Sequence, residues 1–276
     1  MHSLVLFLLF VSFPAFAQPA VISHPDFKTY FDEQGVRGSF LLFDQQKNRY
    51  QTYSYERCQQ GFLPASTFKI INTLIGLETG VISDSTYELK WDGKKRFAPA
   101  WNHDHTLASA FRVSAVWYYQ ELARRVGLER MTEWVQKARY GKMDITAKTL
   151  DNFWLYGNSR ISQVEQIGFM RRVVGGDVPF SKRNLGILKN LMLLDNKPTY
   201  KLYGKTGWAS YPNDVQPPPG WKEIGWFVGY VETTDTIYYF ATNVEHAPPV
   251  PSTWIPARRA ITEDILREVG VIPPNH

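Results

Sequence analysis

The sequence predicts an α+β fold in which one antiparallel sheet is assembled from both ends of the chain and an all-helical lobe is inserted between them. Two observations lead to this prediction. Strand-like segments lie near the N-terminus and again after Pro198, whereas the segments between them carry helical periodicity. A closing helical segment at 261–271 returns to the sheet lobe.

These segments define the expected organisation. The sheet lobe, of mixed α/β character, comprises 18–65 and 196–276, and the helical lobe comprises 66–195, both within one domain at 18–276. An active cleft would lie where the two lobes meet.

The N-terminal part begins with a short amphipathic helix at 25–35 that Gly35 ends. Two strands follow at 38–44 and 49–55, around the turn-forming residues QQKN. A helix then opens at Ser66, and Gly80 is its expected end.

Helical periodicity dominates the middle of the chain, and β-rich segments dominate the part after it. The helical segments are 109–127, 129–141 and 181–194. The expected strands are 199–210, 222–233 and 236–245, with a turn at Thr234-Asp235.

The composition is that of an ordinary globular protein. Of 276 residues, 44% are hydrophobic and 21% charged, and the formal net charge is +5. The basic residues are scattered in short doublets, whereas nucleic-acid binding needs a clustered stripe. We therefore interpret the positive charge as solvated surface and expect no nucleic-acid partner.

Residues 1–17 have the features of a secretory signal peptide. Their apolar stretch is too short for a comfortable membrane span and ends in Ala15-Phe16-Ala17, a small-x-small pattern typical of cleavage. Only His2 precedes the stretch, so an uncleaved anchor stays as the alternative. We expect the mature chain to start at Gln18, without a membrane span.

Cys58 is the only cysteine, so no internal disulfide can form and a structural free thiol is expected. Export without disulfides suits a bacterial periplasm.

The stretch PASTFK places Ser66 and Lys69 three residues apart, on one face of the predicted helix. A serine hydroxyl needs a nearby base to become a nucleophile, and a lysine can be that base only when burial lowers its pKa. Apolar neighbours such as Phe68 and Ile70 make this burial plausible. The alternative is that Ser66 caps the helix and Lys69 reaches solvent.

A second motif, Gly204 to Gly207, reads GKTG in the first strand after the helical segments. On an edge strand it would form a substrate ledge: Lys205 supplies charge, Thr206 a hydrogen bond, and Gly207 close approach to the backbone. The alternative is an ordinary strand with a bulge. The order S-x-x-K then K-T-G is typical of serine β-lactamases and penicillin-binding proteins. Between them, Ser114 could relay a proton to a leaving nitrogen, and the alternative is a buried helix serine.

In these motifs the chain resembles the class D (oxacillinase-type) serine β-lactamases. The matching stretches, in order, are PASTFK at 64–69, SAV at 114–116, FWL at 153–155, KTG at 205–207 and WFVG at 226–229. The resemblance covers nearly the whole mature chain.

The resemblance implies a hydrolase that opens β-lactam rings through an acyl-enzyme on Ser66. Lys69 would be N-carboxylated by carbon dioxide, and this carbamate (N6-carboxylysine) would be the general base for acylation and deacylation. Trp154 would position the carbamate, Ser114 would relay a proton, and Val116 would help to shield the base. No cofactor beyond the carbon dioxide consumed in this carboxylation, and no metal, is implied.

The resemblance also implies the substrate contacts. The backbone N–H groups of Ser66 and Trp208 would form an oxyanion hole. Lys205 and Thr206, together with Arg258 or its neighbour Arg259, would hold the substrate carboxylate.

One departure concerns the family's Y-G-N motif, for which the matching place reads Tyr140-Gly141-Lys142. A literal Tyr156-Gly157-Asn158 follows Trp154 and is interpreted as coincidental. His103 and His105 form H-x-H, too few ligands for zinc, so surface histidines are expected.

Two other functions stay open. One is a penicillin-sensing receptor domain that stays acylated, and the other is a peptidoglycan transpeptidase or carboxypeptidase. The choice between a monomer and a homodimer, and the preferred β-lactam class, are open as well.

Overall fold

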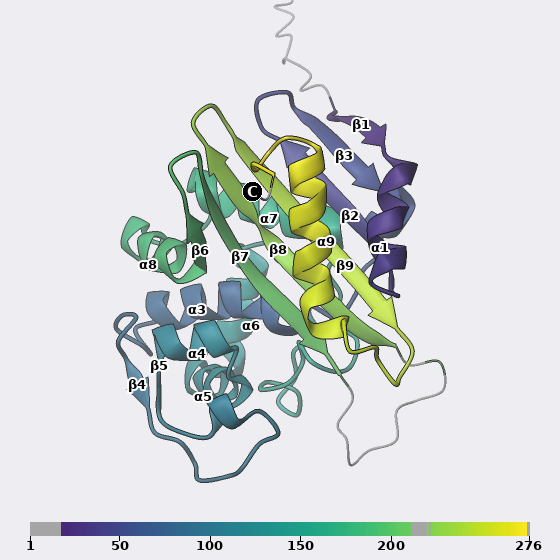
Figure 1. The fold of residues 1–276 in the computed structure, drawn as a ribbon. Helices are drawn as coiled ribbons and strands as arrows, with labels where there is room; N and C mark the ends of the chain where they lie inside the picture. The colour runs from purple at the N-terminus through teal and green to yellow at the C-terminus, as the bar shows by residue number, and fades with distance from the viewer. Residues whose placement is uncertain (1–17, 211–219, 221, 275–276) are drawn as a thin grey trace, which may run out of the picture.

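The chain, as a computed structural model, forms a seven-stranded sheet with helices on both faces and a group of helices beside it (Figure 1). The structure describes residues 18–210, 220 and 222–274. The predicted signal peptide at 1–17 and most of the loop at 212–221 lie outside the described residues.

The sheet has the strand order β1-β3-β2-β9-β8-β7-β6, which joins the two ends of the chain as the sequence predicts. The prediction of an antiparallel sheet is wrong for β1, which pairs with β3 in parallel, whereas the other pairs are antiparallel. β2 pairs antiparallel with β9, so an N-terminal hairpin lies beside the C-terminal strands. The strands are β1 (Ala20–Ser23), β2 (Arg37–Asp44), β3 (Arg49–Tyr53), β6 (Leu193–Asn196), β7 (Tyr200–Ala209), β8 (Glu223–Thr233) and β9 (Ile237–His246).

Helices cover both faces of this sheet, so its central strands are buried (Figure 1). The helices α1 (Lys28–Glu33) and α9 (Trp254–Glu268) pack on one face, and α7 (Gln163–Gly175) packs on the other. The sequence analysis named no separate helix for α7, although it comes from the middle, helical part of the chain. The short elements η1 (Pro25–Phe27) and α2 (Tyr55–Cys58) complete this part.

The remaining helices gather beside the β6 and β7 side of the sheet (Figure 1). α3 (Lys69–Glu78) is the central element of this group of helices and is almost wholly buried. Around it lie η2 (Ala65–Phe68), β4 (Glu88–Leu89), η3 (Pro99–Trp101), β5 (His105–Thr106), α4 (Leu107–Val113), α5 (Val116–Val126), α6 (Leu128–Lys137) and α8 (Lys182–Met192).

Local boundaries follow from turn residues. Gly35 and Gly80 both have positive φ, +66° and +69°, and they end the first helical segment and α3 as the sequence predicts. The predicted continuous helix at 109–127 is wrong, because Ser114 takes a left-handed conformation with φ +59° and separates α4 from α5.

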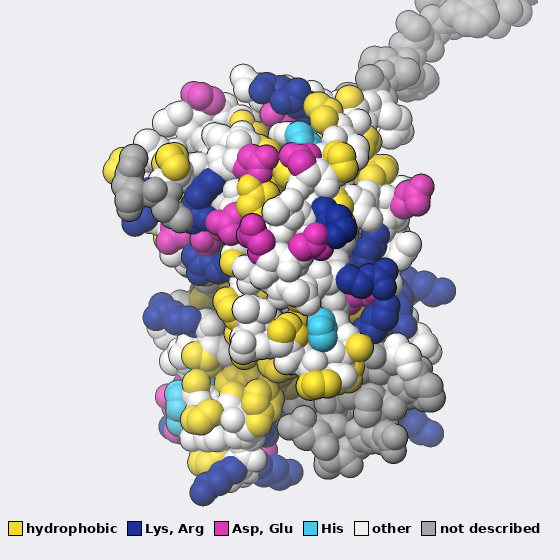
Figure 2. Space-filling model, turned by 45° about the vertical axis from the view of Figure 1, so that its right-hand side comes forward, with side chains coloured by type: hydrophobic (Ala, Val, Ile, Leu, Met, Phe, Trp, Pro, Cys, Tyr) yellow, Lys and Arg dark blue, Asp and Glu magenta, His cyan; other side chains and the backbone are white. Residues whose placement is uncertain are grey.

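Charged side chains of both signs lie on the face shown in Figure 2. The face in Figure 2 carries Lys and Arg side chains interspersed with Asp and Glu side chains, which agrees with the interpretation of solvated surface charge. None of the helices between 18 and 274 that the structure describes has the length and apolar character needed to cross a bilayer.

Candidate active site

The turn before α3 brings Ser66 and Lys69 together. Ser66 lies in η2, one turn before Lys69 begins α3. The amine of Lys69 donates a hydrogen bond to Ser66 Oγ at 2.7 Å. Ser66 makes no side-chain cap of the helix, so the N-cap alternative is wrong. The two predicted reactive groups are in direct contact.

Lys69 is completely buried, with 0% of its surface exposed. Burial, with a smaller effect from the charge of Lys205, holds the pKa of Lys69 well below its ordinary value of 10.5. Its amine also lies 5.3 Å from the centre of the Tyr119 ring. The alternative that Lys69 reaches solvent is therefore wrong, and a neutral amine is favoured at this position.

Trp154 contacts Ala65 and Phe68, the sequence neighbours of Ser66 and Lys69, and has an unused hydrogen-bond donor. Its ring is fully buried and stacks on Phe68 at a centroid distance of 5.2 Å, and its carbonyl accepts a hydrogen bond from Ala65 N at 2.8 Å. Its indole Nε1 has no partner among the described residues. A buried donor without an acceptor is costly, so the site fits an acceptor group added to the Lys69 side chain.

Lys205 on β7 lies opposite the break between α4 and α5. Its amine donates to Ser114 Oγ at 3.1 Å and to the carbonyl of Thr206 at 3.1 Å. Burial, with the charge of Arg258, lowers the pKa of Lys205 to about 7. Lys205 can therefore exchange a proton near neutral pH, and Ser114 is within reach of it. Val116, at the start of α5, is half-buried.

β7 runs directly past the nucleophile turn. A methyl group added to Gly207 would lie 3.3 Å from Ser66 N, which shows how closely this strand approaches the serine backbone. β6 pairs only with residues 201–203 of β7, so the expectation of an edge strand holds for the half that carries the motif. Thr206 is half-buried, and the indole of Trp208 donates to Glu223 at 2.5 Å.

The two arginines of α9 have different surroundings. Arg258 is buried, donates only to the carbonyl of Trp254 at 3.3 Å, and has an Nε without a partner among the described residues. Burial lowers its pKa to about 10. Arg259 instead forms ion pairs with Glu263 and Asp195. Arg258 has unused hydrogen-bond capacity, and its charge is close enough to affect Lys205.

The Tyr140-Gly141-Lys142 stretch contributes its tyrosine and its backbone. Tyr140 is fully buried, and its hydroxyl lies 3.4 Å from both Thr67 Oγ1 and Gln166 Oε1. The side chain of Lys142 is exposed, and its backbone pairs with Arg160. The other candidate, Asn158, bonds Asp144 at the surface.

The expectation of surface histidines is wrong for His105. It is 1% exposed, and its ring nitrogens contact Ser109 Oγ and the carbonyl of Ala100 at 2.9 and 3.0 Å. Burial lowers its pKa. Within the part of the chain that the structure describes, no group of three His, Cys, Asp or Glu side chains could hold a metal ion.

Cys58 is buried and unpaired, as expected for a structural thiol. Burial raises its pKa to about 11, which keeps it protonated and inert.

Three buried residues near the nucleophile were missed by the sequence analysis. They are Thr67, Tyr119 and Gln166. Thr67 lies within the quoted PASTFK stretch, but nothing in the pattern distinguishes a polar side chain that contacts the site from one that only fills the core.

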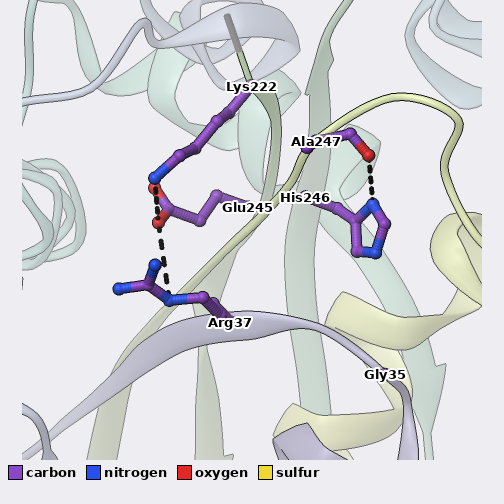
Figure 3. A pocket seen from close by; sticks show the side chains of 6 residues that line it. All are labelled: Gly35, Arg37, Lys222, Glu245, His246 and Ala247. Atoms are coloured by element: carbon purple, nitrogen blue, oxygen red, sulfur yellow. Dashed lines mark hydrogen bonds and ion pairs between the residues drawn. The ribbon is translucent and has the colours of Figure 1, made fainter. Parts of the chain in front are cut away.

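A separate surface cavity of about 280 Å³ lies where β2 begins and β9 ends (Figure 3). Glu245 there pairs with Lys222 at 3.0 Å and with Arg37 at 4.0 Å, and His246 bonds the carbonyl of Ala247. None of the predicted site residues lines this cavity.

Comparisons with known proteins relate the chain to a penicillin-binding domain and to β-lactamases. Residues 37–267 match the penicillin binding protein transpeptidase domain. The chain is 36% identical over 277 residues to beta-lactamase OXA-48 of Klebsiella pneumoniae, covering 99% of this chain and 100% of that one. It is 40% identical over 235 residues to the probable beta-lactamase YbxI of Bacillus subtilis, covering 85% and 82%. A crystal structure of the class D beta-lactamase YbXI from Nostoc superposes with a TM-score of 0.82 at 40% identity, covering 89% and 99%.

Proposed function

The chain belongs to the class D β-lactamases and hydrolyses β-lactams, and we propose that it does so through an acyl-enzyme on Ser66 with N-carboxylated Lys69 as the general base. The observation that carries this proposal is the 2.7 Å hydrogen bond between the buried amine of Lys69 and Ser66 Oγ. This contact joins a nucleophile, Ser66, to an amine whose pKa is lowered, and both side chains are buried.

A carbamate on Lys69 would supply a carboxylate-like base. It needs a neutral amine, and complete burial of Lys69 favours that form. The partnerless indole N–H of Trp154 is the donor that such a group requires. Val116 at the start of α5 would limit the access of water to the base.

The surrounding residues have distinct proposed roles. The backbone N–H groups of Ser66 and Trp208 would stabilise the oxyanion that forms when the ring carbonyl is attacked. Ser114, hydrogen-bonded to Lys205 at 3.1 Å, would pass a proton to the leaving nitrogen. This relay fits a lysine whose pKa is about 7.

Two buried basic side chains and one neighbouring hydroxyl would orient the substrate. Lys205 and Arg258 are both buried cations, and Thr206 is the neighbouring hydroxyl on β7. We assign the substrate carboxylate to Lys205, Thr206 and Arg258. Arg259 is a poorer candidate because its guanidinium is already paired with Asp195 and Glu263.

Purified protein mixed with a chromogenic cephalosporin tests the proposal. We expect rapid turnover of many substrate molecules per enzyme, and loss of covalent labelling in Ser66→Ala. A single stoichiometric acylation would instead indicate a penicillin sensor. Transfer of the acyl group to a peptide amine would indicate a transpeptidase.

We further propose that residues 1–17 direct export to the periplasm. Mass spectrometry of protein recovered from the periplasm tests this by showing whether the chain starts at Gln18. Sedimentation of the purified protein distinguishes a monomer from a homodimer.

A further inference from the structure

We propose that Gln166 of α7, assisted by Tyr140, is a positioning residue that holds the nucleophile turn in its reactive geometry through Thr67. This inference rests on the proposed role of Ser66. It assigns a function to Gln166, which lies outside the motifs, to Thr67 within PASTFK, and to the tyrosine of the Tyr140-Gly141-Lys142 stretch.

The first step of the argument is the strain in the turn. Ala65, immediately before Ser66, has φ +50°, in the left-handed region that non-glycine residues avoid. Such a conformation persists only when the surrounding structure fixes it. One restraint is the hydrogen bond from Ala65 N to the carbonyl of Trp154, at 2.8 Å.

The second restraint is Thr67. Its hydroxyl donates to the carbonyl of Pro64 at 2.6 Å, and its backbone N–H contacts the same carbonyl at 3.2 Å. The side chain therefore closes the turn around Ser66. A methyl group on Gly207 would lie 3.3 Å from both Thr67 N and Thr67 Cγ2, so the closed turn also fits against β7.

Gln166 fixes Thr67 from the far side. Its Nε2 donates to Thr67 Oγ1 at 2.8 Å. Because the hydroxyl proton of Thr67 is used on Pro64, the oxygen is left as an acceptor, and this sets the orientation of the amide. The opposite atom, Gln166 Oε1, then accepts from the Tyr140 hydroxyl at 3.4 Å.

This chain of hydrogen bonds is completely buried. Thr67, Tyr140 and Gln166 are each 0% exposed, so no water competes for their donors and acceptors. Gln166 is further fixed by its helix, whose first turn carries a capping box formed by Ser162 and Glu165. The ring of Tyr140 is held edge-on against Phe68 and Phe169.

The arrangement also explains the departure at Lys142. In this stretch Tyr140 contacts Thr67 of the nucleophile turn, and Gly141 has φ +54°, with only 2.7 Å between an added methyl group and the carbonyl oxygen of Arg160. Residue 142 contributes a backbone bridge to Arg160 and an exposed side chain, so a lysine can occupy it.

Helix α7 also carries a residue that can be used as a matched control for Gln166. Gln163 lies one turn before Gln166 on α7 and is equally buried, but it bonds Ser39 and Ala241 of the sheet and not Thr67. Gln163→Met and Gln166→Met remove the same groups from the same helix. Both should lower the melting temperature, so a stability effect alone will not separate them.

The separating measurement is pre-steady-state acylation by a chromogenic cephalosporin. We expect Gln166→Met to lower the acylation rate constant about 10- to 100-fold without a matching change in non-covalent affinity, because misplacement of a reacting group by less than 1 Å has effects of that size. Gln163→Met should stay within about threefold of the parent, a bound consistent with the scatter of distant substitutions. Equal rate losses in the two variants would overturn the proposal.

A second pair keeps the test decisive if Gln166→Met does not fold. Thr67→Val removes the hydroxyl and should reproduce the rate loss, whereas Thr67→Ser retains it and should restore most of the rate. In the double variant Thr67→Val/Gln166→Met the losses should not multiply, because both act on one interaction. Parental rates in Thr67→Val contradict the proposal. Failure of the parent protein itself to become acylated would count against the function of Ser66 instead.

Discussion

Gly207 of β7 lies against the backbone of Ser66 so closely that a methyl group would come within 3.3 Å of the serine nitrogen. The substrate ledge and the nucleophile, about 140 residues apart in sequence, are thus in direct contact. A side chain at this position would have to displace one of them.

For this reason we expect Gly207→Ala to lower kcat/KM at least about tenfold while the protein stays folded, since the shift needed is a few tenths of an ångström. Gly186→Ala in α8 is the control, because nothing lies within 4 Å of its added methyl group. Steady-state kinetics and thermal melting of both variants check this. Unchanged kcat/KM in Gly207→Ala would show that the contact does not affect catalysis.

Lys69 should be essential and should make activity dependent on pH and bicarbonate. Lys69→Ala removes the base, and we expect turnover to fall about 10²- to 10⁴-fold, mostly through deacylation. In the parent, activity should fall when bicarbonate is removed and the pH is lowered, because protonation of the amine reverses carboxylation. Turnover and accumulated acyl-enzyme are measured together, and parental turnover in the alanine variant would exclude the mechanism.

The same lysine should reduce stability. Its pKa in the folded protein is well below that in the unfolded chain, near 10.5. Between these two values the unfolded chain binds a proton that the folded protein does not, so the free energy of unfolding decreases as pH falls through the unfolded value. In protein freed of bicarbonate, where Lys69 carries no carbamate, Lys69→Met should therefore raise the free energy of unfolding at pH 7 by about 1–4 kcal/mol, the range found when apolar side chains replace buried ion pairs. Denaturant unfolding at pH 7 and pH 10 tests this, and the gain should shrink at the higher pH.

Trp154 should support carboxylation through its indole N–H. Trp154→Phe keeps a ring that can stack on Phe68 but removes the donor, so the bicarbonate concentration for half-maximal activity should rise about 10- to 100-fold, the value of one hydrogen bond to a charged group. Trp254→Phe is the matched control, because Trp254 is also buried with an indole N–H that has no described partner. An identical bicarbonate response in the two variants would exclude this role.

Arg258 should recognise the substrate carboxylate. Arg258→Ala should raise the KM for a carboxylate-bearing β-lactam about 10- to 100-fold, whereas Arg259→Ala, which loses half-exposed ion pairs, should have little effect. The methyl ester of the same β-lactam should not discriminate between parent and Arg258→Ala. The reverse ranking of the two arginines would assign the carboxylate to Arg259.

Lys205 should produce the alkaline limb of the pH profile. Because burial and Arg258 lower its pKa to about 7, it carries positive charge below that pH and loses it above, so the KM for an anionic substrate should rise as pH increases through 7. Lys205→Arg, which stays charged, should flatten this rise. KM measured from pH 6 to pH 9 in both proteins tests this, and the same rise in KM in the parent and in Lys205→Arg would contradict it.

The sequence predicted most of the fold because its elements have strong local signals. Gly35 and Gly80 ended helices where a left-handed residue was needed, and the β-rich segments formed the central strands of the sheet. The break at Ser114 was missed because Ala115 and Val113 continue the helical pattern on both sides. A left-handed serine there depends on tertiary contacts, including the hydrogen bond from Lys205.

The motif residues of the site could be predicted from the sequence, but the buried residues that hold them in position could not. Ser66 and Lys205 lie in motifs whose spacing indicates their chemistry, and the structure brings β7, which carries Lys205, against the turn that carries Ser66. Gln166 lies 100 residues from Ser66 in sequence, on a helix whose other glutamine contacts the sheet. Only the packing of α7 shows which of the two reaches the nucleophile turn. His105 was misjudged for the same reason, since its ring is enclosed by the loop that precedes it.

Lys69, Lys205 and Arg258 form a group of buried basic side chains, and among the described residues no acid contributes to the pKa of any of them. Among the described residues no acidic side chain therefore offsets these charges, and under the proposed mechanism the carbamate on Lys69 and the carboxylate of the β-lactam would supply the negative charge. Selection for heat tolerance alone would favour apolar residues at these positions, whereas selection for β-lactam hydrolysis would retain the basic ones. Hydrolytic activity and thermal robustness thus impose opposite demands on the same few positions.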